Sequence, residues 1–296
     1  MASENSPVTG INKLSLRDRL DSYKRHPGSF VLLLLVLLAA FITFCILIFI
    51  IAFILMKGVP YLNADLFSLT YTSENCSVVP AVINTLIMTV LALLIAIPFG
   101  VFSAIYLAEY AKKGSRAVAL IRVTTETLSG IPSIVYGLFG LLFFVTSLEW
   151  GYSILAGAFT LAIMILPLIM RTTEEALLSV SDSYREGSFG LGAGKLRTIF
   201  RIVLPTAIPG ILAGVILGIG RIVGETAALM YTSGTVANVP SSVMGSGRTL
   251  ALHMYVLSQE GLHVDQAYAT AVILLLLVVG INTLSGFVAK KLVKGK

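Results

Sequence analysis

Arg221 and Glu225 are the residues best placed to do chemistry, because both carry charge inside a long apolar run. A charged side chain near the middle of a bilayer costs about 2.5 to 3.5 kcal/mol on insertion scales, so its presence needs a reason. Four residues apart, the two should share one face of a helix. In one interpretation Arg221 offers its guanidinium to an oxyanion in a water-filled path while Glu225 keeps it oriented; in the other, the pair is structural and locks two helices. Ionisable groups inside transporters usually face a cavity, which favours the first interpretation.

Three further charged residues lie near the ends of other apolar runs. Arg122 and Glu126 repeat the four-residue spacing near the expected inner surface of the membrane, where an ordinary interfacial pair is the simpler interpretation. Arg171 directly follows the fourth apolar run, a position typical of a basic residue that marks the inner edge of the membrane.

A polar segment over residues 171–206 is too long for a simple helix connection and too short for a domain. A polar helix over residues 172–180, a glycine-rich turn and a second helix over residues 195–203 would form a helix-turn-helix elbow. Its glycines do not make a phosphate-binding loop, because Leu196 stands where that motif requires Ser or Thr. We expect the elbow to contact another protein; the competing interpretation is a basic loop that only fixes the orientation of the chain.

Helices that cross a membrane must position these residues. Apolar residues make up 56% of the chain and charged residues only 12%, with a mean hydropathy of +0.92. A helix needs about 20 apolar residues to cross a hydrocarbon layer about 30 Å thick. Six runs come near that length, so the sequence predicts an all-α, polytopic membrane helical bundle with about six transmembrane helices, the third of which contains the helix breaker Gly130-Ile-Pro132-Ser133. The predicted spans are residues 30–56, 82–108, 118–147, 153–170, 207–230 and 267–289.

Most of the 21 lysines and arginines lie on one side of these spans. The positive-inside rule places that side, and with it both chain ends, in the cytoplasm. We therefore expect a cell membrane protein with a cytoplasmic arm at residues 1–29, a transmembrane domain at 30–296 and an extracytoplasmic segment at 231–266. Basic residues do not gather with aromatic residues, which argues against a nucleic-acid partner. The three histidines have no metal-ligand spacing and no nucleophile-base pair is evident, so neither a metal, a cofactor nor an enzyme activity is expected.

The elbow carries a motif that resembles the EAA loop of ABC importer permeases. That pattern is Glu-Ala-Ala, three residues, Gly, nine residues, then Ile-x-Leu-Pro. Five positions match it, and two small residues, Gly187 and Ser188, replace the alanines. The resemblance implies a type I ABC importer permease-like fold and an elbow that docks on a separate ATPase subunit. The matching residues are Glu186, Gly192, Ile202, Leu204 and Pro205.

Four other motifs narrow the resemblance to the PstA-type permeases of phosphate-specific ABC transporters. They are Tyr106-Leu-Ala-Glu109-Tyr110, the segment from Gly130 to Gly137, the segment from Ile169 to Glu174, and Arg221-Ile-Val-Gly224-Glu225-Thr226. In that family, arginines at the positions of Arg171 and Arg221 and the acid at the position of Glu225 are taken to matter for phosphate passage. The chain departs from the family pattern at Ala228, where those permeases have proline.

The resemblance implies the permease subunit of an ATP-driven phosphate importer, which forms half of the translocation pathway within membrane lipid. The partners it implies are a second homologous permease subunit, two ATPase subunits and an extracytoplasmic phosphate-binding protein. Two alternatives stay open: an ABC permease for another oxyanion or polar solute, and an ion-driven secondary transporter that needs no ATPase.

Overall fold

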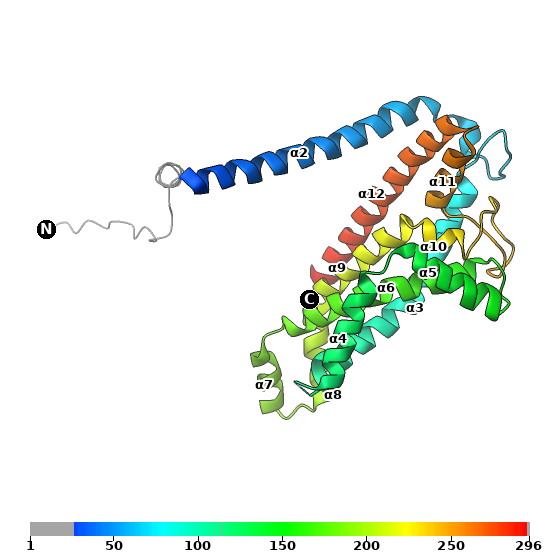
Figure 1. Cartoon of the computed structure of the whole chain (residues 1–296). Coiled ribbons are helices and arrows are strands. Elements are labelled where there is room, and N and C mark those ends of the chain that lie inside the picture. The colour runs from blue at the N-terminus through cyan, green and yellow to red at the C-terminus, as the bar shows by residue number, and fades with distance from the viewer. Residues whose placement is uncertain (1–26, 113, 295–296) are drawn as a thin grey trace. The chain divides into compact units, whose positions relative to one another are not determined.

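The computed structural model describes residues 27–112 and 114–294, and all regular elements in this part of the chain are helical (Figure 1). The predicted N-terminal arm therefore lies, up to residue 26, outside the described residues. The chain divides into two compact units, residues 1–56 and residues 57–296. The described part of the first unit consists of residues 27–56 of helix α2 (Pro27–Gly58). The 32 residues of α2 are apolar almost throughout and, at 1.5 Å per residue, are long enough to cross a bilayer.

Helices α3 (Val79–Ile105) and α6 (Ile154–Leu178) form the centre of the second unit. Alanines and a glycine recur every fourth residue along α3 and are buried, so this face of the helix has no large side chain. The backbone of α3 therefore approaches α6 closely, and a Cβ at Gly100 would lie 2.8 Å from Cγ2 of Ile169 on α6. Small residues at a helix interface allow such packing in membranes, where van der Waals contact drives helix association. The stripe consists of Ala92, Ala96, Gly100 and Ala104.

The remaining long helices pack around this pair. α9 (Leu204–Val223) contacts α6 and α3, and α12 (Val264–Lys294) contacts α9. Among the residues that the structure describes, five helical runs are long and apolar enough to cross a membrane. A sixth crossing results if one bent pair of helices counts as a single span. The predicted bundle of about six spans is thus confirmed by length and composition.

That bent pair is the predicted third span. Helix α4 (Arg116–Ser129) and helix α5 (Ser133–Gly140), which continues as the π-helical turn η4 (Leu141–Ser147), meet at an angle of 99°. Pro132 directly precedes α5, and the predicted helix breaker is confirmed. The hydroxyl of Tyr136 donates to the carbonyl of Leu128 across the bend, 2.8 Å away, and so fixes one helix against the other.

The elbow differs from its prediction at the first helix. Residues 172–178 are not a separate helix but continue α6, because Ala176 and Leu177 bury their side chains in the same core as Ile199 and Val203. The first helix of the elbow is instead α7 (Asp182–Gly190). Gly192 then takes a left-handed φ of +79°, a conformation that favours glycine. The predicted second helix is confirmed as α8 (Lys195–Thr198) and the π-helical turn η5 (Ile199–Val203), which run without a break into α9.

The segment between α9 and α12 contains two short helices, α10 (Ala227–Met230) and α11 (Leu250–Glu260). α11 begins two residues after Arg248, within the segment predicted to be extracytoplasmic. It buries His253, whose Nε2 lies 3.3 Å from the carbonyl oxygen of Cys76. The guanidinium of Arg248 lies over the ring of Tyr71, 4.8 Å from its centroid.

The stability of this segment is expected to fall at acidic pH. Burial, together with the nearby charge of Arg248, lowers the pKa of His253 from 6.5 to about 3. In the unfolded chain the imidazole of His253 is protonated below about pH 6.5, whereas in the folded chain it stays neutral down to about pH 3. Each pH unit between these two values should therefore lower the free energy of unfolding by about 1.4 kcal/mol. The thermal unfolding midpoint of the purified protein should therefore be lower at pH 5.5 than at pH 7.5. This difference should be larger in the wild type than in His253→Gln. Equal drops in the two proteins would contradict this assignment.

Candidate functional site

The membrane-embedded charges near the end of α9 are arranged differently from their prediction. α9 ends at Val223, with Gly224 at its C-cap, so the expectation that Arg221 and Glu225 share one helix face is wrong. Within the described residues no ion pair joins the two. Gly224 is the C-cap, with a φ of −87° and a ψ of −1°, and Glu225 lies beyond the last turn of α9, so its side chain no longer follows the face that carries Arg221.

Glu225 is buried and bonds to backbone rather than to Arg221. Its Oε1 accepts from the N–H of Thr226 at 3.2 Å and from the N–H of Ala228 at 3.1 Å, at the start of α10. A proline at position 228, as in the permeases that this chain resembles, could not donate the second of these bonds. The carboxylate thus secures the turn between α9 and α10, and the bend forms without proline.

Arg221 is the cation left free by this arrangement. It lies in the last turn of α9 and is half-buried. Among residues 27–112 and 114–294 its guanidinium has no hydrogen-bond or ion-pair partner, although it is near enough to Tyr136 for an electrostatic interaction. A guanidinium carries five N–H donors in a planar fork that matches an oxyanion. The donors of Arg221 are therefore available to a solute.

Helix α5 packs against α10 and α6 and so supports the turn that follows Arg221 and carries Glu225. A Cβ at Gly137 would lie 2.8 Å from Cα of Ala228 on α10, and a Cβ at Gly140 would lie 2.3 Å from Oγ1 of Thr160 on α6. Only glycine permits such close backbone contact. The bent pair α4–α5 therefore fixes the start of α10, and through it the turn that follows Arg221.

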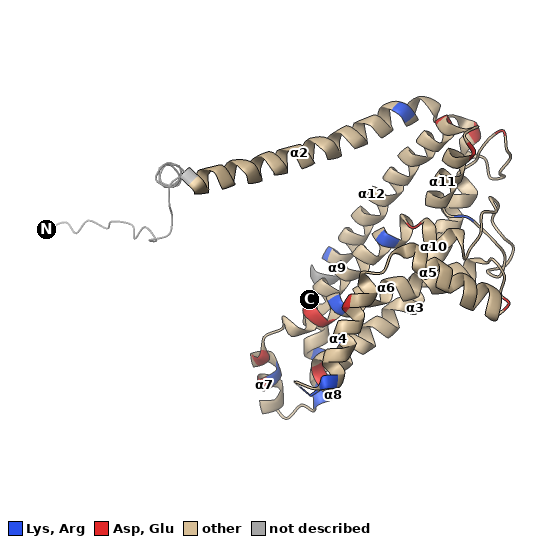
Figure 2. Ribbon diagram, in the orientation of Figure 1, with Lys and Arg blue, Asp and Glu red and all other residues tan. Residues whose placement is uncertain are grey.

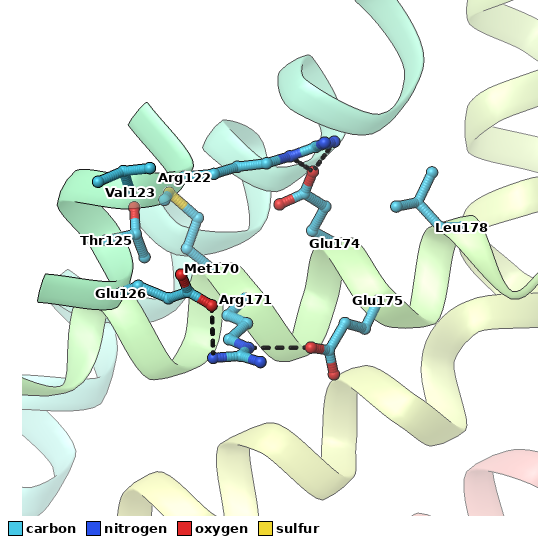
Figure 3. Close-up of a pocket in the computed structure, with 9 residues that line it drawn as sticks. All are labelled: Arg122, Val123, Thr125, Glu126, Met170, Arg171, Glu174, Glu175 and Leu178. Atoms are coloured by element: carbon cyan, nitrogen blue, oxygen red, sulfur yellow. Dashed lines mark hydrogen bonds and ion pairs between the residues drawn. The ribbon is translucent and has the colours of Figure 1, made fainter. Parts of the chain in front are cut away.

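A second group of charges lies between α4 and α6, where it lines a pocket of about 310 Å³ (Figure 3). Nε and Nη2 of Arg122 bond to Oε1 of Glu174 at 2.8 and 2.5 Å, and Glu174 is only 10% exposed. Arg171 bonds to Glu175 at 2.9 Å and pairs with Glu126 at 3.4 Å. The expected pair between Arg122 and Glu126 is therefore wrong: each finds its partner on α6, because α4 docks with both residues facing that helix.

This pocket suits an anion less well than the end of α9 does. Its two arginines face three carboxylates, and the charge of Arg171 is shared between two of them. Arg171 lies inside α6 rather than in a loop at its end. In the part of the chain that the structure describes, no hydrogen bond or ion pair links this cluster to Arg221 or Glu225.

The elbow places the motif residues at a separate site. Glu186 is exposed on α7, Gly192 forms the turn, and Ile202, Leu204 and Pro205 follow at the start of the fifth apolar run. Ser188 and Thr198 join α7 to α8 through their hydroxyls, 2.8 Å apart and buried, which explains a small polar residue where the EAA pattern has alanine. Large apolar side chains are exposed around the turn, and Leu191 is 91% exposed. Such a surface is typical of a protein-protein contact.

Apolar helices of membrane-spanning length, one of which carries an unpaired guanidinium in its last turn, are typical of a membrane transport protein. The family of binding-protein-dependent transport system inner membrane components matches residues 96–295. The chain belongs to this family, and so it is a multi-pass membrane permease and not an enzyme.

Individual relatives agree with this assignment. The chain is 34% identical over 248 residues to the probable ABC transporter permease protein YqgI of Bacillus subtilis, covering 77% of this chain and 82% of that one. It is 36% identical over 208 residues to the phosphate transport system permease protein PstA of Mycobacterium leprae, covering 68% and 67%.

Solved structures resemble the chain in fold. A bacterial ABC transporter involved in the import of the acidic polysaccharide alginate aligns with a TM-score of 0.66 at 18% identity, over 92% of this chain and 98% of that one. An inward-facing MetNI methionine ABC transporter aligns with a TM-score of 0.60 at 20% identity, over 73% and 95%. These likenesses confirm the predicted all-α fold of the type I ABC importer permeases.

Proposed function

We propose that the chain is the permease subunit of an ATP-driven phosphate importer and forms half of its translocation pathway. The observation that carries this proposal is the free guanidinium of Arg221 at the end of an apolar helix. Relatives named as phosphate transport permeases, at 36% identity and above, support phosphate as the solute.

Arg221 lowers the barrier for phosphate as the anion leaves bulk water. Charge-assisted hydrogen bonds from a planar guanidinium replace part of the hydration of the phosphate oxygens. Glu225 contributes through its position: by bonding to Thr226 and Ala228 it holds the turn beside Arg221 and leaves the arginine unpaired. We assign Arg171 to the same pathway, where it attracts the anion less strongly, because Glu126 and Glu175 offset its charge.

The elbow couples this pathway to a motor on another chain. Glu186 and the exposed apolar side chains around Gly192 dock on an ATPase subunit. Ile202 lies in η5, and Leu204 and Pro205 are the first residues of α9, so the elbow continues directly into this helix. The complete transporter contains this chain, a second homologous permease, two ATPase subunits and an extracytoplasmic phosphate-binding protein. Lys and Arg residues near α4, α7 and α8 support a cytoplasmic elbow (Figure 2). By the positive-inside rule, the basic residues near both chain ends put the termini on the cytoplasmic side as well.

Purification and reconstitution test the proposal. The chain, isolated from membranes that hold its natural partners, should bring an ATPase with it, and vesicles containing the complex and its binding protein should take up phosphate only when ATP is supplied. Excess sulfate should not compete. Competition by sulfate would favour a permease for other oxyanions. Uptake that follows an ion gradient and persists without ATP would favour a secondary transporter and contradict the proposal.

A further inference from the structure

The polypeptide at the end of α3 is joined to the elbow by a nearly buried ion pair. The π-helical turn η3 (Tyr106–Tyr110) ends this helix and carries Glu109, whose side chain is only 8% exposed. Its Oε1 accepts from Nε and Nη2 of Arg185 on α7, at 3.1 and 2.7 Å. Glu109 belongs to the motif Tyr106–Tyr110, for which neither the solute site nor the elbow has supplied a role.

Arg185 also holds the end of α6. Its Nη1 donates to the carbonyl of Val180 at 2.7 Å, and its Nη2 donates to the carbonyl of Leu177 at 2.9 Å. Leu177 lies in the last turn of α6, and its carbonyl also accepts from the N–H of Val180 at 3.3 Å; Val180 lies just beyond the helix, so Arg185 contacts both the end of α6 and the chain that leaves it. A single guanidinium, 15% exposed, thus joins α7 to both α6 and η3.

The second helix of the elbow contacts the same turn. Nζ of Lys195, the first residue of α8, lies 4.7 Å from the ring centroid of Tyr110. This distance is within the range of a cation–π interaction. Both helices of the elbow therefore contact adjacent residues of η3, one through Glu109 and the other through Tyr110.

We propose that Glu109 and Arg185 are positioning residues that transmit a displacement of the elbow to α3 and α6 together. This inference rests on the proposed coupling of the elbow to an ATPase. Only residues 179–181 connect α6 to α7 along the chain, and such a short link can bend. The ion pair removes that freedom, because separating a buried carboxylate from its guanidinium leaves both charges unpaired. Close packing at Gly100 then makes α3 move with α6.

Loss of the link should uncouple the transporter rather than disassemble it. The complex with its ATPase and binding protein is reconstituted with Glu109→Gln or Arg185→Gln, and phosphate uptake per ATP hydrolysed is measured on assembled complex only. We expect that ratio to fall about fivefold or more, the low end of coupling between linked sites, while ATP hydrolysis continues. The double variant should be no worse than Arg185→Gln alone, since that substitution already removes the bond to Glu109 together with the bonds to the end of α6.

Asp182→Asn is the matched control. Asp182 also pairs with Arg185, at 3.1 Å, but it lies on the same helix and is 76% exposed. Its loss leaves the link to η3 intact, so the ratio should stay at the wild-type value. Glu109→Asp, which keeps the charge, should restore part of what Glu109→Gln loses. If the glutamine variants do not assemble, Arg185→Lys is measured instead. A lysine cannot bond to Glu109, Leu177 and Val180 at once, so phosphate uptake per ATP hydrolysed should fall in this variant too.

An unchanged ratio in Glu109→Gln and Arg185→Gln, or in Arg185→Lys where only that variant assembles, would overturn the inference. Failure of the wild-type complex to take up phosphate would instead contradict the proposed function. In that case hydrogen exchange still tests the link: ATP should alter exchange at residues 106–110 in the wild type and not in Glu109→Gln. The same change in both proteins would also overturn it.

Discussion

Replacing Arg221 with alanine is expected to abolish ATP-driven phosphate uptake while the assembled complex stays at its normal amount. No described residue depends on Arg221 for a hydrogen bond, so its removal leaves no partner unpaired. Each charge-assisted hydrogen bond contributes about 1.5 to 3 kcal/mol, and losing two should slow uptake about 100-fold or more. The measurement is initial uptake of labelled phosphate into vesicles, divided by the amount of complex.

Two further variants test whether uptake needs the planar geometry of Arg221 and whether Arg171 contributes as much as Arg221. Arg221→Lys keeps the charge but loses the planar fork, so it should retain a fraction of the uptake. Arg171→Ala should have a smaller effect than Arg221→Ala, because two carboxylates already share the charge of Arg171. Normal uptake by Arg221→Ala at normal expression would remove this guanidinium from the mechanism. If Arg171→Ala loses more phosphate uptake than Arg221→Ala, the main anion site is the pocket between α4 and α6.

The sequence predicted those features that depend on local composition. Apolar runs of membrane-spanning length predicted the helices, and the Gly130–Ser133 breaker predicted where the third run bends. Gly192 predicted the turn of the elbow, since its positive φ is a requirement that glycine meets. The size of the bend, 99°, could not be predicted, because Tyr136 and Gly137 fix it through contacts with α4 and α10.

The candidate site shows the limit of spacing arguments. Arg221 and Glu225 have helical spacing, and the one signal that the helix ends between them is Gly224, a residue common inside membrane helices. Arg122 and Glu126 also have helical spacing, yet each pairs with α6. Pairs that join distant segments depend on how helices dock, and that arrangement is not encoded in any short window of sequence.

The same limit applies to Glu109 and Arg185. Glu109 lay in a motif that marked the family, and Arg185 directly precedes the first residue of the elbow motif, but they are far apart in the chain. Only the fold brings the end of α3 beside α7. An acid at the end of an apolar run was the available signal, since such a group requires a cationic partner if the fold buries it.

Gly137→Ala is expected to destabilise the protein and to reduce uptake together. The added Cβ would lie 2.8 Å from Cα of Ala228 and 3.2 Å from the carbonyl oxygens of Ala227 and Ala228. These are backbone atoms, which cannot rotate away as a side chain can, so α5 and α10 must separate. Overpacking of this kind costs about 1 to 3 kcal/mol. Displacement of α10 would also disturb the bonds of Glu225 and therefore the turn beside Arg221.

Gly286→Ala is the control for this substitution, because a Cβ at Gly286 in α12 would meet no atom within 4 Å. Thermal unfolding midpoints and uptake per assembled complex should both fall in Gly137→Ala and stay near wild type in Gly286→Ala. Ala228→Gly should not rescue Gly137→Ala, since the contact is with the backbone of residue 228 and not with its methyl group. Wild-type stability and uptake in Gly137→Ala would show that α5 does not fix the turn next to Arg221, and the support assigned to the bent pair α4–α5 would be wrong.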